Sequence, residues 1–268
     1  MTVSGLVLAG LLVLLTVFAW LLARARAESA RLRRRLEAAA TNLQQLQMSF
    51  SRFAPDELIE RIIAEGVSTS GEKKEVTVLF ADLVGFTALS ERVDPPVLVR
   101  ILNGYFERMS RAISDHRGHV STFIGDGILA FFGALAPNPW QSNDAVQAAL
   151  AMRAALATYN RELRAEGLPE LSIGVGLQRG TGVVGLVGSR ELMEFAFVGR
   201  AVNVAARVQG LTRQLGADII VTEGVRRALD PRFALRALPP TEVKGIEKPI
   251  AIHAVERFEP GAPPGGAS

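Results

Sequence analysis

The chain contains no cysteine, and aromatic residues make up only 6% of its 268 residues. Without cysteine it forms no disulfide, no zinc–thiolate site and no thiol nucleophile. The three histidines are scattered and show no His-Glu-x-x-His spacing, so a histidine metal site is not expected. The sequence also lacks the Gly-x-x-x-x-Gly-Lys-Ser/Thr phosphate loop and the Gly-x-Ser-x-Gly nucleophile elbow. These absences exclude disulfide-stabilised folds, thiol enzymes, P-loop proteins and hydrolases that depend on that elbow.

Positive and negative charges are nearly balanced, with a formal net charge of +3 at pH 7. Much of the basicity lies in one cluster that follows an apolar segment: Arg24, Arg26, Arg31, Arg33, Arg34 and Arg35. Such a cluster in this position is typical of the cytoplasmic edge of a membrane. Nucleic-acid binding is not expected, because no recognised module or aromatic–basic interleaving occurs elsewhere.

Residues 3–23 are almost wholly apolar, and about 20 such residues span a bilayer as a helix. A cleaved signal peptide is the alternative, but it normally has a basic start and a shorter apolar core, and Met1-Thr2 supply no side-chain charge. Because the arginines follow the segment, the positive-inside rule places the rest of the chain in the cytoplasm. We therefore predict a single transmembrane helix over 1–23 in the cell (inner) membrane, with a membrane regulator as a candidate partner.

A heptad pattern continues through the arginine cluster, at Ala25, Ser29, Leu32, Leu36, Ala39, Leu43, Leu46 and Phe50. Spacings of four and three alternate for more than three heptads, which predicts a parallel two-stranded coiled coil over residues 24–52. An amphipathic helix lying on the globular domain is the alternative. Membrane anchoring favours pairing, because it raises the local concentration of the chain. Residues 53–72 are expected to form a short helix, beginning at Pro55, and a polar linker.

Residues 73–258 carry the periodicities of an α+β domain. The expected strands are 75–81, 120–124, 128–132, 171–177, 183–187 and 219–222, and the expected helices are 95–116, 142–166 and 200–215. The glycines between 174 and 188 are interpreted as strand turns. The order strand, helix, hairpin, helix, strand predicts the ferredoxin-like split βαβ arrangement, with additions. The Pro/Gly-rich tail, 259–268, is expected to be disordered.

Two aspartates stand where apolar runs end. Asp82 follows the strand 75–81, and Asp126 lies between two glycines in the hairpin turn. Taken singly, Asp82 is better explained as a helix cap and Asp126 as a turn residue. The expected fold, however, places both strands side by side, so the carboxylates meet at one edge and repel unless cations neutralise them. The pair predicts a hard-cation site suited to phosphoryl chemistry on a nucleotide.

Two polar elements follow later in the chain. Asn203 and Arg207 are four residues apart, so a helix presents both on one face, although a solvated face explains a lone pair of this kind as well. Lys244 stands beside Gly245, which suits a phosphate but equally suits a surface turn.

Together, these elements resemble the class III nucleotidyl cyclases over residues 73–257. The resemblance is carried by Phe80-Ala-Asp82-Leu-Val-Gly-Phe-Thr87, Ile124-Gly-Asp126-Gly-Ile-Leu-Ala130 and Val198-Gly-Arg-Ala-Val-Asn203-Val-Ala-Ala-Arg207. It implies a class III cyclase catalytic domain that works as a homodimer with active sites at the subunit interface, in agreement with the predicted coil. The implied reaction converts ATP to 3′,5′-cyclic AMP and pyrophosphate.

The resemblance also implies the role of each residue. Asp82, Asp126 and the Leu83 carbonyl would bind two Mg²⁺ or Mn²⁺ ions, which activate the ribose 3′-hydroxyl and hold the triphosphate. From the other protomer, Asn203 would orient the ribose and Arg207 would stabilise charge at the α-phosphate. The phosphates would be held by the backbone amides of Val84, Gly85, Phe86 and Thr87, and by Lys244.

The chain departs from the family pattern at the base pocket. Members that use ATP have a lysine four residues before the second metal aspartate and an aspartate or threonine seven residues before the asparagine. Those places hold Thr122 and Ala196 here, and the guanine-selecting glutamate and cysteine are absent as well. The Thr122 hydroxyl can bond a base edge, whereas the Ala196 side chain cannot. ATP is therefore expected on family frequency alone, and a guanylate cyclase or a catalytically weak nucleotide-binding signalling module are the alternatives.

Overall fold

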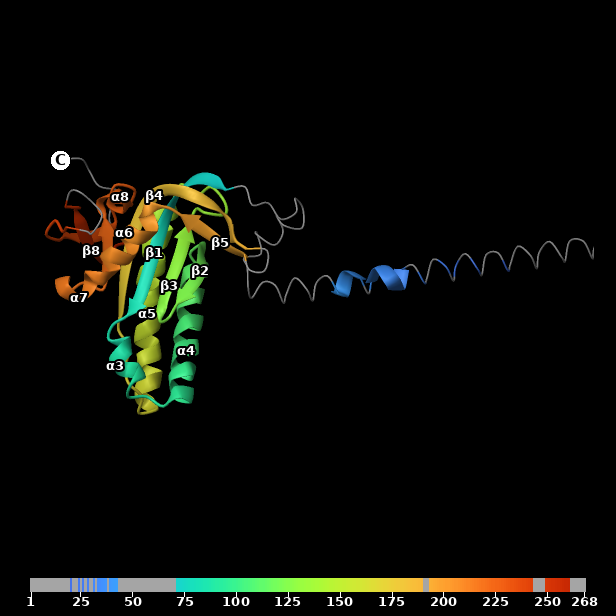
Figure 1. The fold of residues 1–268 in the computed structure, drawn as a ribbon, viewed down its shortest axis with the longest axis horizontal. Helices are drawn as coiled ribbons and strands as arrows, with labels where there is room; N and C mark the ends of the chain where they lie inside the picture. Colours follow the sequence, from blue (N-terminus) through green and yellow to red (C-terminus); the bar gives the residue numbers. More distant parts are fainter. Residues whose placement is uncertain are drawn as a thin grey trace, which may run out of the picture. The chain divides into compact units, whose positions relative to one another are not determined.

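The chain divides into two units, residues 1–66 and 67–268, in the computed structural model. The structure describes residues 20, 24, 26, 28, 31, 33–37, 39–42, 71–189, 193–242 and 249–260. Figure 1 draws these parts as helices and strands coloured along the sequence.

In the N-terminal unit, every described residue between 20 and 42 is helical and exposed. Two predicted heptad positions, Leu36 and Ala39, belong to this helix, and the Leu36 side chain is 68% exposed. The other heptad positions lie outside the described residues. Most of three further predicted segments also lies outside them: the membrane helix (1–23), the short helix and linker (53–72) and the tail (259–268). Within the described part of the chain, no helix is both long and apolar enough to cross a bilayer.

The second unit is built on one mixed sheet. Its strands are β1 (Glu72–Leu83), β2 (Gly118–Ile124), β3 (Gly127–Phe132), β4 (Ile173–Gly188), β5 (Met193–Val198), β6 (Ile219–Thr222), β7 (Phe233–Ala237) and β8 (Ile252–Phe258). Their order across the sheet is β2-β3-β1-β4-β6-β8-β7, and β5 pairs with β4. All pairings are antiparallel except β4 with β6, which is parallel. The predicted α+β class is confirmed.

The described helices of this unit are α3 (Phe86–Ser90), α4 (Pro95–Ser114), α5 (Gln141–Ala165), α6 (Arg200–Gly210), α7 (Thr212–Leu215) and α8 (Glu223–Arg226). Helices α4 and α5 pack side by side, as Figure 1 shows. Alternation along β1 divides the core: Leu79 and Ala81 join the cluster that contains Ile101 and Tyr105 of α4. Their neighbours Val76 and Val78 point to the opposite face and pack with α6. The sheet is therefore covered by α4 and α5 on one face and by α6 on the other.

Three expectations from the sequence are wrong in detail. The two strands predicted over 171–177 and 183–187 form one continuous strand, β4. The helix predicted over 200–215 is two helices, of which α7 ends at Gly216 in the left-handed conformation (φ 59°). Strand β5, which pairs with the far end of β4, was not expected at all.

Glycines in β4 allow α6 to approach the sheet closely. A Cβ atom at Gly176 would lie 2.4 Å from both the Ala205 carbonyl oxygen and the Gln209 nitrogen, which are backbone atoms of α6. A Cβ atom at Gly180 would lie 3.0 Å from the Cβ of Ala201. The glycines interpreted as turn residues are thus contact residues, because only a strand without side chains there accommodates the helix.

We predict that Gly176→Ala lowers the free energy of unfolding by about 2 kcal/mol, because the added methyl group must push α6 off the sheet. The measurement is urea unfolding followed by circular dichroism. Gly210→Ala is the matched control: no atom lies within 4 Å of its added methyl group, so the same substitution in α6 should be neutral or slightly stabilising. Equal effects of the two substitutions would contradict the close packing described here.

Candidate active site

Asp82 and Asp126 lie together at one end of the sheet. Ala81 of β1 pairs with Ile128 of β3, which brings the end of β1 beside the β2–β3 turn. There the Leu83 N–H donates a hydrogen bond to Asp126 Oδ2 (3.2 Å). A methyl group at Gly127 would lie 3.3 Å from Asp82 Oδ1, so glycine preserves the space around the carboxylates. Their convergence, expected from the sequence, is present, although Asp82 is part of β1 and does not cap the following helix.

Burial and the neighbouring carboxyl group act together on Asp82. Burial, the largest cause, acts with the hydrogen bond and negative charge of Asp126 to raise the pKa of Asp82 to about 7, while a hydrogen bond from the Leu83 backbone opposes the shift. Two carboxylates this close cannot both ionise at neutral pH unless a positive charge joins them.

The donor set of the pair fits a hard divalent cation. Among the described residues, no group of three or more His, Cys, Asp or Glu side chains gathers anywhere that could hold a metal. Mg²⁺ characteristically uses one or two carboxylates and completes its shell with water and substrate phosphate oxygens. Asp82 and Asp126, with the Leu83 carbonyl, match that pattern of ligation.

The loop after β1 departs from the prediction at one residue. The Val84 N–H donates to the Ser172 carbonyl (2.8 Å) and extends the ladder between β1 and β4, so this amide is not available to a phosphate. Gly85 follows in the left-handed conformation (φ 74°) and leads into α3. Because the first N–H groups of a helix lack internal partners, the amides of Phe86 and Thr87 remain open.

Asn203 and Arg207 lie on the exposed face of α6. The opposite face of the helix, which includes Ala205 and Val208, is buried on the sheet. Among the described residues, neither Asn203 nor Arg207 forms a hydrogen bond with either aspartate. Within the described part of one chain, the Asn–Arg pair is therefore not hydrogen-bonded to the carboxylate pair.

Thr122 and Ala196 lie on strands that touch. The Ser121 hydroxyl of β2 donates to the Phe195 carbonyl of β5 (3.1 Å), and each of these residues is the chain neighbour of a predicted base-pocket residue. The Thr122 hydroxyl makes only a long hydrogen bond (3.4 Å) to the Phe123 carbonyl. Lys244 lies outside the described residues.

Comparison with known proteins identifies the domain. The family model described as the adenylate and guanylate cyclase catalytic domain matches residues 68–257. The chain belongs to this family.

Several relatives and solved cyclases are similar to the chain. An adenylate cyclase of Anabaena cylindrica is 36% identical over 219 residues, which cover 78% of this chain and 43% of the relative. Adenylate cyclase 1 of Rhizobium meliloti is 31% identical over 209 residues, covering 77% of this chain and 31% of the relative. The chain thus spans less than half the length of these curated relatives.

Two crystal structures extend the similarity to the fold. The guanylyl cyclase Cya2 superposes with a TM-score of 0.68 at 31% identity, over 71% of this chain and 96% of that chain. The adenylyl cyclase CyaB from P. aeruginosa superposes with a TM-score of 0.67 at 27% identity, over 72% of this chain and all of that chain. The fold is common to cyclases that are named for different bases.

The cyclase domain has one further polar group near the carboxylates that the sequence did not reveal. Tyr105 of α4 is fully buried, and within the described part of the chain its hydroxyl has no hydrogen-bond partner. Burial raises the pKa of Tyr105, and the negative charges of Asp82 and Asp126 raise it further. In the sequence, Tyr105 is indistinguishable from an ordinary core residue on the apolar face of its helix.

We predict that the metal-free cyclase loses stability as the pH rises from about 4 to about 7. The raised pKa of Asp82 means that the folded chain retains, across this interval, a proton that the unfolded chain has released. Because a divalent cation replaces that proton, Mn²⁺ should raise the Tm more at about pH 8 than at about pH 5. The Tm is measured with EDTA or Mn²⁺ at each pH.

Asp82→Asn should abolish both the pH effect and the Mn²⁺ effect on the Tm. The control Asp115→Asn, at an exposed site, should keep both effects. A Mn²⁺ response that survives Asp82→Asn would contradict the assignment of Asp82 as a metal ligand.

Proposed function

We propose that the chain is a homodimeric adenylate cyclase that converts ATP to 3′,5′-cyclic AMP and pyrophosphate. The observation that carries the proposal is the convergence of Asp82 and Asp126 at the end of β1, within a fold whose family makes cyclic nucleotides. Curated relatives that bear the name adenylate cyclase support ATP as the substrate.

In this proposal, Asp82, Asp126 and the Leu83 carbonyl hold two Mg²⁺ or Mn²⁺ ions. The bound ions would lower the pKa of the ribose 3′-hydroxyl and neutralise charge on the triphosphate. The amides of Gly85, Phe86 and Thr87, together with Lys244, would contact phosphate oxygens. Val84 is left out of this set, because its N–H is bonded to Ser172.

The second half of each site would come from a second copy of the chain. Arg207 would stabilise the charge that develops at the α-phosphate, and Asn203 would fix the ribose so that its 3′-oxygen attacks in line. Both residues are exposed and, among the described residues, make no hydrogen bond to the carboxylates of their own chain, which supports a shared site. Five apolar side chains on the strands around the base pocket are between 45% and 56% exposed, which suits a subunit interface. They are Phe123, Ile124, Val183, Val187 and Val198.

We also propose that the parts before the domain organise the dimer. A transmembrane helix over 1–23 would anchor the chain with the catalytic domain in the cytoplasm, and a coiled coil over 24–52 would pair two chains. The exposed Leu36 on the described helix supports a seam there. A regulator in the membrane would then act through the coil, since each site needs both protomers in register.

A catalytically weak nucleotide-binding module is the second candidate. It is favoured by Thr122 and Ala196, which offer one weakly engaged hydroxyl and no second polar side chain for the base. A site with few base contacts should lose affinity and selectivity more than turnover, provided that the metal and transition-state groups remain.

The first test is product identification. The full chain, incubated with ATP or GTP and Mn²⁺ over a range of protein concentrations, should release cyclic AMP and pyrophosphate, detected by mass spectrometry. Specific activity should rise with protein concentration, because the site forms on dimerisation. Nucleotide binding without any cyclic product would favour the second candidate, and cyclic GMP as the main product would overturn the choice of ATP.

The second test is complementation between inactive variants. Asp82→Ala and Arg207→Ala should each lower kcat by at least about 100-fold, since each removes a group that stabilises the transition state. Mixed and reassembled, they should recover up to about a quarter of wild-type activity, because a heterodimer retains one intact site. Arg213→Ala, on the neighbouring helix α7, is the control and should stay active. If heterodimers form without recovery, the shared site is wrong.

A further inference from the structure

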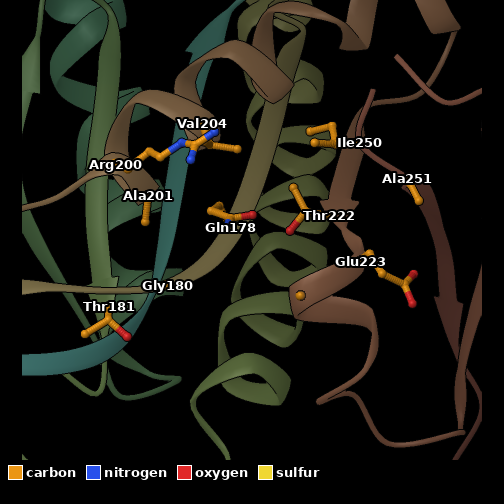
Figure 2. A pocket seen from close by; sticks show the side chains of 11 residues that line it. Gln178, Gly180, Thr181, Arg200, Ala201, Val204, Thr222, Glu223, Ile250 and Ala251 are labelled. Atoms are coloured by element: carbon orange, nitrogen blue, oxygen red, sulfur yellow. The ribbon is translucent and has the colours of Figure 1, made fainter. Parts of the chain in front are cut away.

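A pocket lies beside α6, between this helix and strands β4 and β6. Its volume is about 510 Å³, and it is lined by β4, α6, β6, α8 and the two residues that precede β8 (Figure 2). Pockets of roughly 300–1,000 Å³ accommodate metabolite-sized ligands. Asp82, Asp126, Asn203 and Arg207 are absent from its lining, so the pocket is distinct from the carboxylate pair and from the Asn–Arg pair.

An unpartnered hydroxyl group faces this pocket. Thr222, at the end of β6, is only 4% exposed, and its Oγ1 has no hydrogen-bond partner among the residues that the structure describes. Gln178 of β4 uses its amide nitrogen to donate to the Arg179 carbonyl (2.7 Å), and Figure 2 shows its carbonyl oxygen turned toward Thr222. A buried hydroxyl without a partner is unfavourable, whereas a bound molecule that supplies the missing hydrogen bond removes the penalty.

Two charged residues line the pocket, Arg200 and Glu223, and neither is without a partner. The Glu223 carboxylate accepts hydrogen bonds from Arg226, Arg227 and His253. Figure 2 shows this carboxylate directed away from Thr222 and Gln178. Together with apolar lining residues such as Ile250 and Val204, this arrangement suits a ligand that carries no net charge.

The pocket is in contact with the helix that carries two proposed catalytic residues. Ala201 and Val204 line it from the buried face of α6, while Asn203 and Arg207 occupy the exposed face of the same helix. A molecule that fills the pocket would contact α6 directly and would bias its position on the glycines of β4.

We propose that this pocket binds a small uncharged molecule with an apolar body and an amide-like hydrogen-bonding edge, and that the bound molecule regulates turnover by positioning α6. The edge would accept a hydrogen bond from the Thr222 hydroxyl and donate one to the Gln178 carbonyl oxygen. The regulatory half rests on the proposed cyclase function, whereas the binding half does not.

The binding half is tested with benzamide, which combines a phenyl ring with a donor–acceptor edge. Saturation-transfer NMR on the full chain should give a measurable Kd for benzamide and a weaker one for methyl benzoate, which lacks the donor. Thr222→Val should weaken benzamide binding about 10-fold, the effect of losing one hydrogen bond of about 1.4 kcal/mol. The same substitution should raise the Tm, because it removes the unpartnered hydroxyl.

Gly224→Leu provides a second variant that closes the pocket. A Cβ atom there would lie 3.5 Å from the Arg179 carbonyl oxygen and 3.9 Å from Thr222 Oγ1, so the backbone accepts a Cβ atom at this position in the pocket wall. It should abolish benzamide binding, and Thr158→Val, an exposed threonine on α5, should leave binding unchanged. Absence of binding to the wild type, or equal affinity for wild type and both pocket variants, would overturn the proposal.

The regulatory half is tested by turnover at saturating benzamide. The wild-type rate of cyclic nucleotide formation should change at least about 2-fold, and the rate of Gly224→Leu should not respond. Asp82→Ala should lack turnover yet bind benzamide like the wild type, which separates the pocket from the catalytic assignment. An unchanged wild-type rate overturns regulation, and a wild type without cyclase activity overturns both regulation and the proposed function, while the binding measurements still decide the pocket.

Discussion

The arrangement of the catalytic domain depends on the register of β1 between its two antiparallel neighbours. Pairing with β3 sets Ala81 opposite Ile128, and pairing with β4 sets Asp82 opposite Gly174. Side chains alternate along a strand, so a shift of one residue would turn Asp82 into the core beneath α4 and α5 and expose Leu83. Two ladders and the buried residues on both faces hold this register, and the carboxylate pair follows from it.

The second constraint is the closeness of α6 to β4. Gly176 and Gly180 remove the side chains that would hold the helix away, so one strand determines the positions of both Asp82 and α6. The same contact leaves room beside the helix, where the pocket with Thr222 lies. One helix, α6, therefore carries both pocket-lining residues and the Asn–Arg pair proposed for catalysis.

Much of the fold was predictable because its helices and strands have clear periodicity, and the Asp82–Asp126 pair was predictable because apolar runs end at both residues. Tertiary contacts decide the rest. Glycines that normally interrupt a strand continue β4 here because α6 packs on them, and β5 is stabilised by pairing with that extension. The Val84 N–H is hydrogen-bonded to the Ser172 carbonyl, because β1 extends beyond its predicted end and its pairing with β4 continues to that residue. A local sequence pattern does not identify which distant residues a strand or a backbone N–H will contact.

Two buried hydroxyl groups without partners in the described part of the chain lie in the two regions proposed to act, one near the carboxylates and one at the pocket. Among the described residues, Tyr105 and Thr222 are the ones whose buried side-chain oxygens lack any hydrogen-bond partner. The negative charges of Asp82 and Asp126 raise the pKa of Tyr105, and Thr222 lines the pocket beside α6. Core packing alone would favour phenylalanine and valine at these positions, since those residues keep the shape and remove the cost. Buried polar groups without partners occur mainly at functional sites, where a ligand or a charge interacts with them. The charges of the carboxylates act on Tyr105, and a ligand bound in the pocket, as proposed, would give the Thr222 hydroxyl its missing partner.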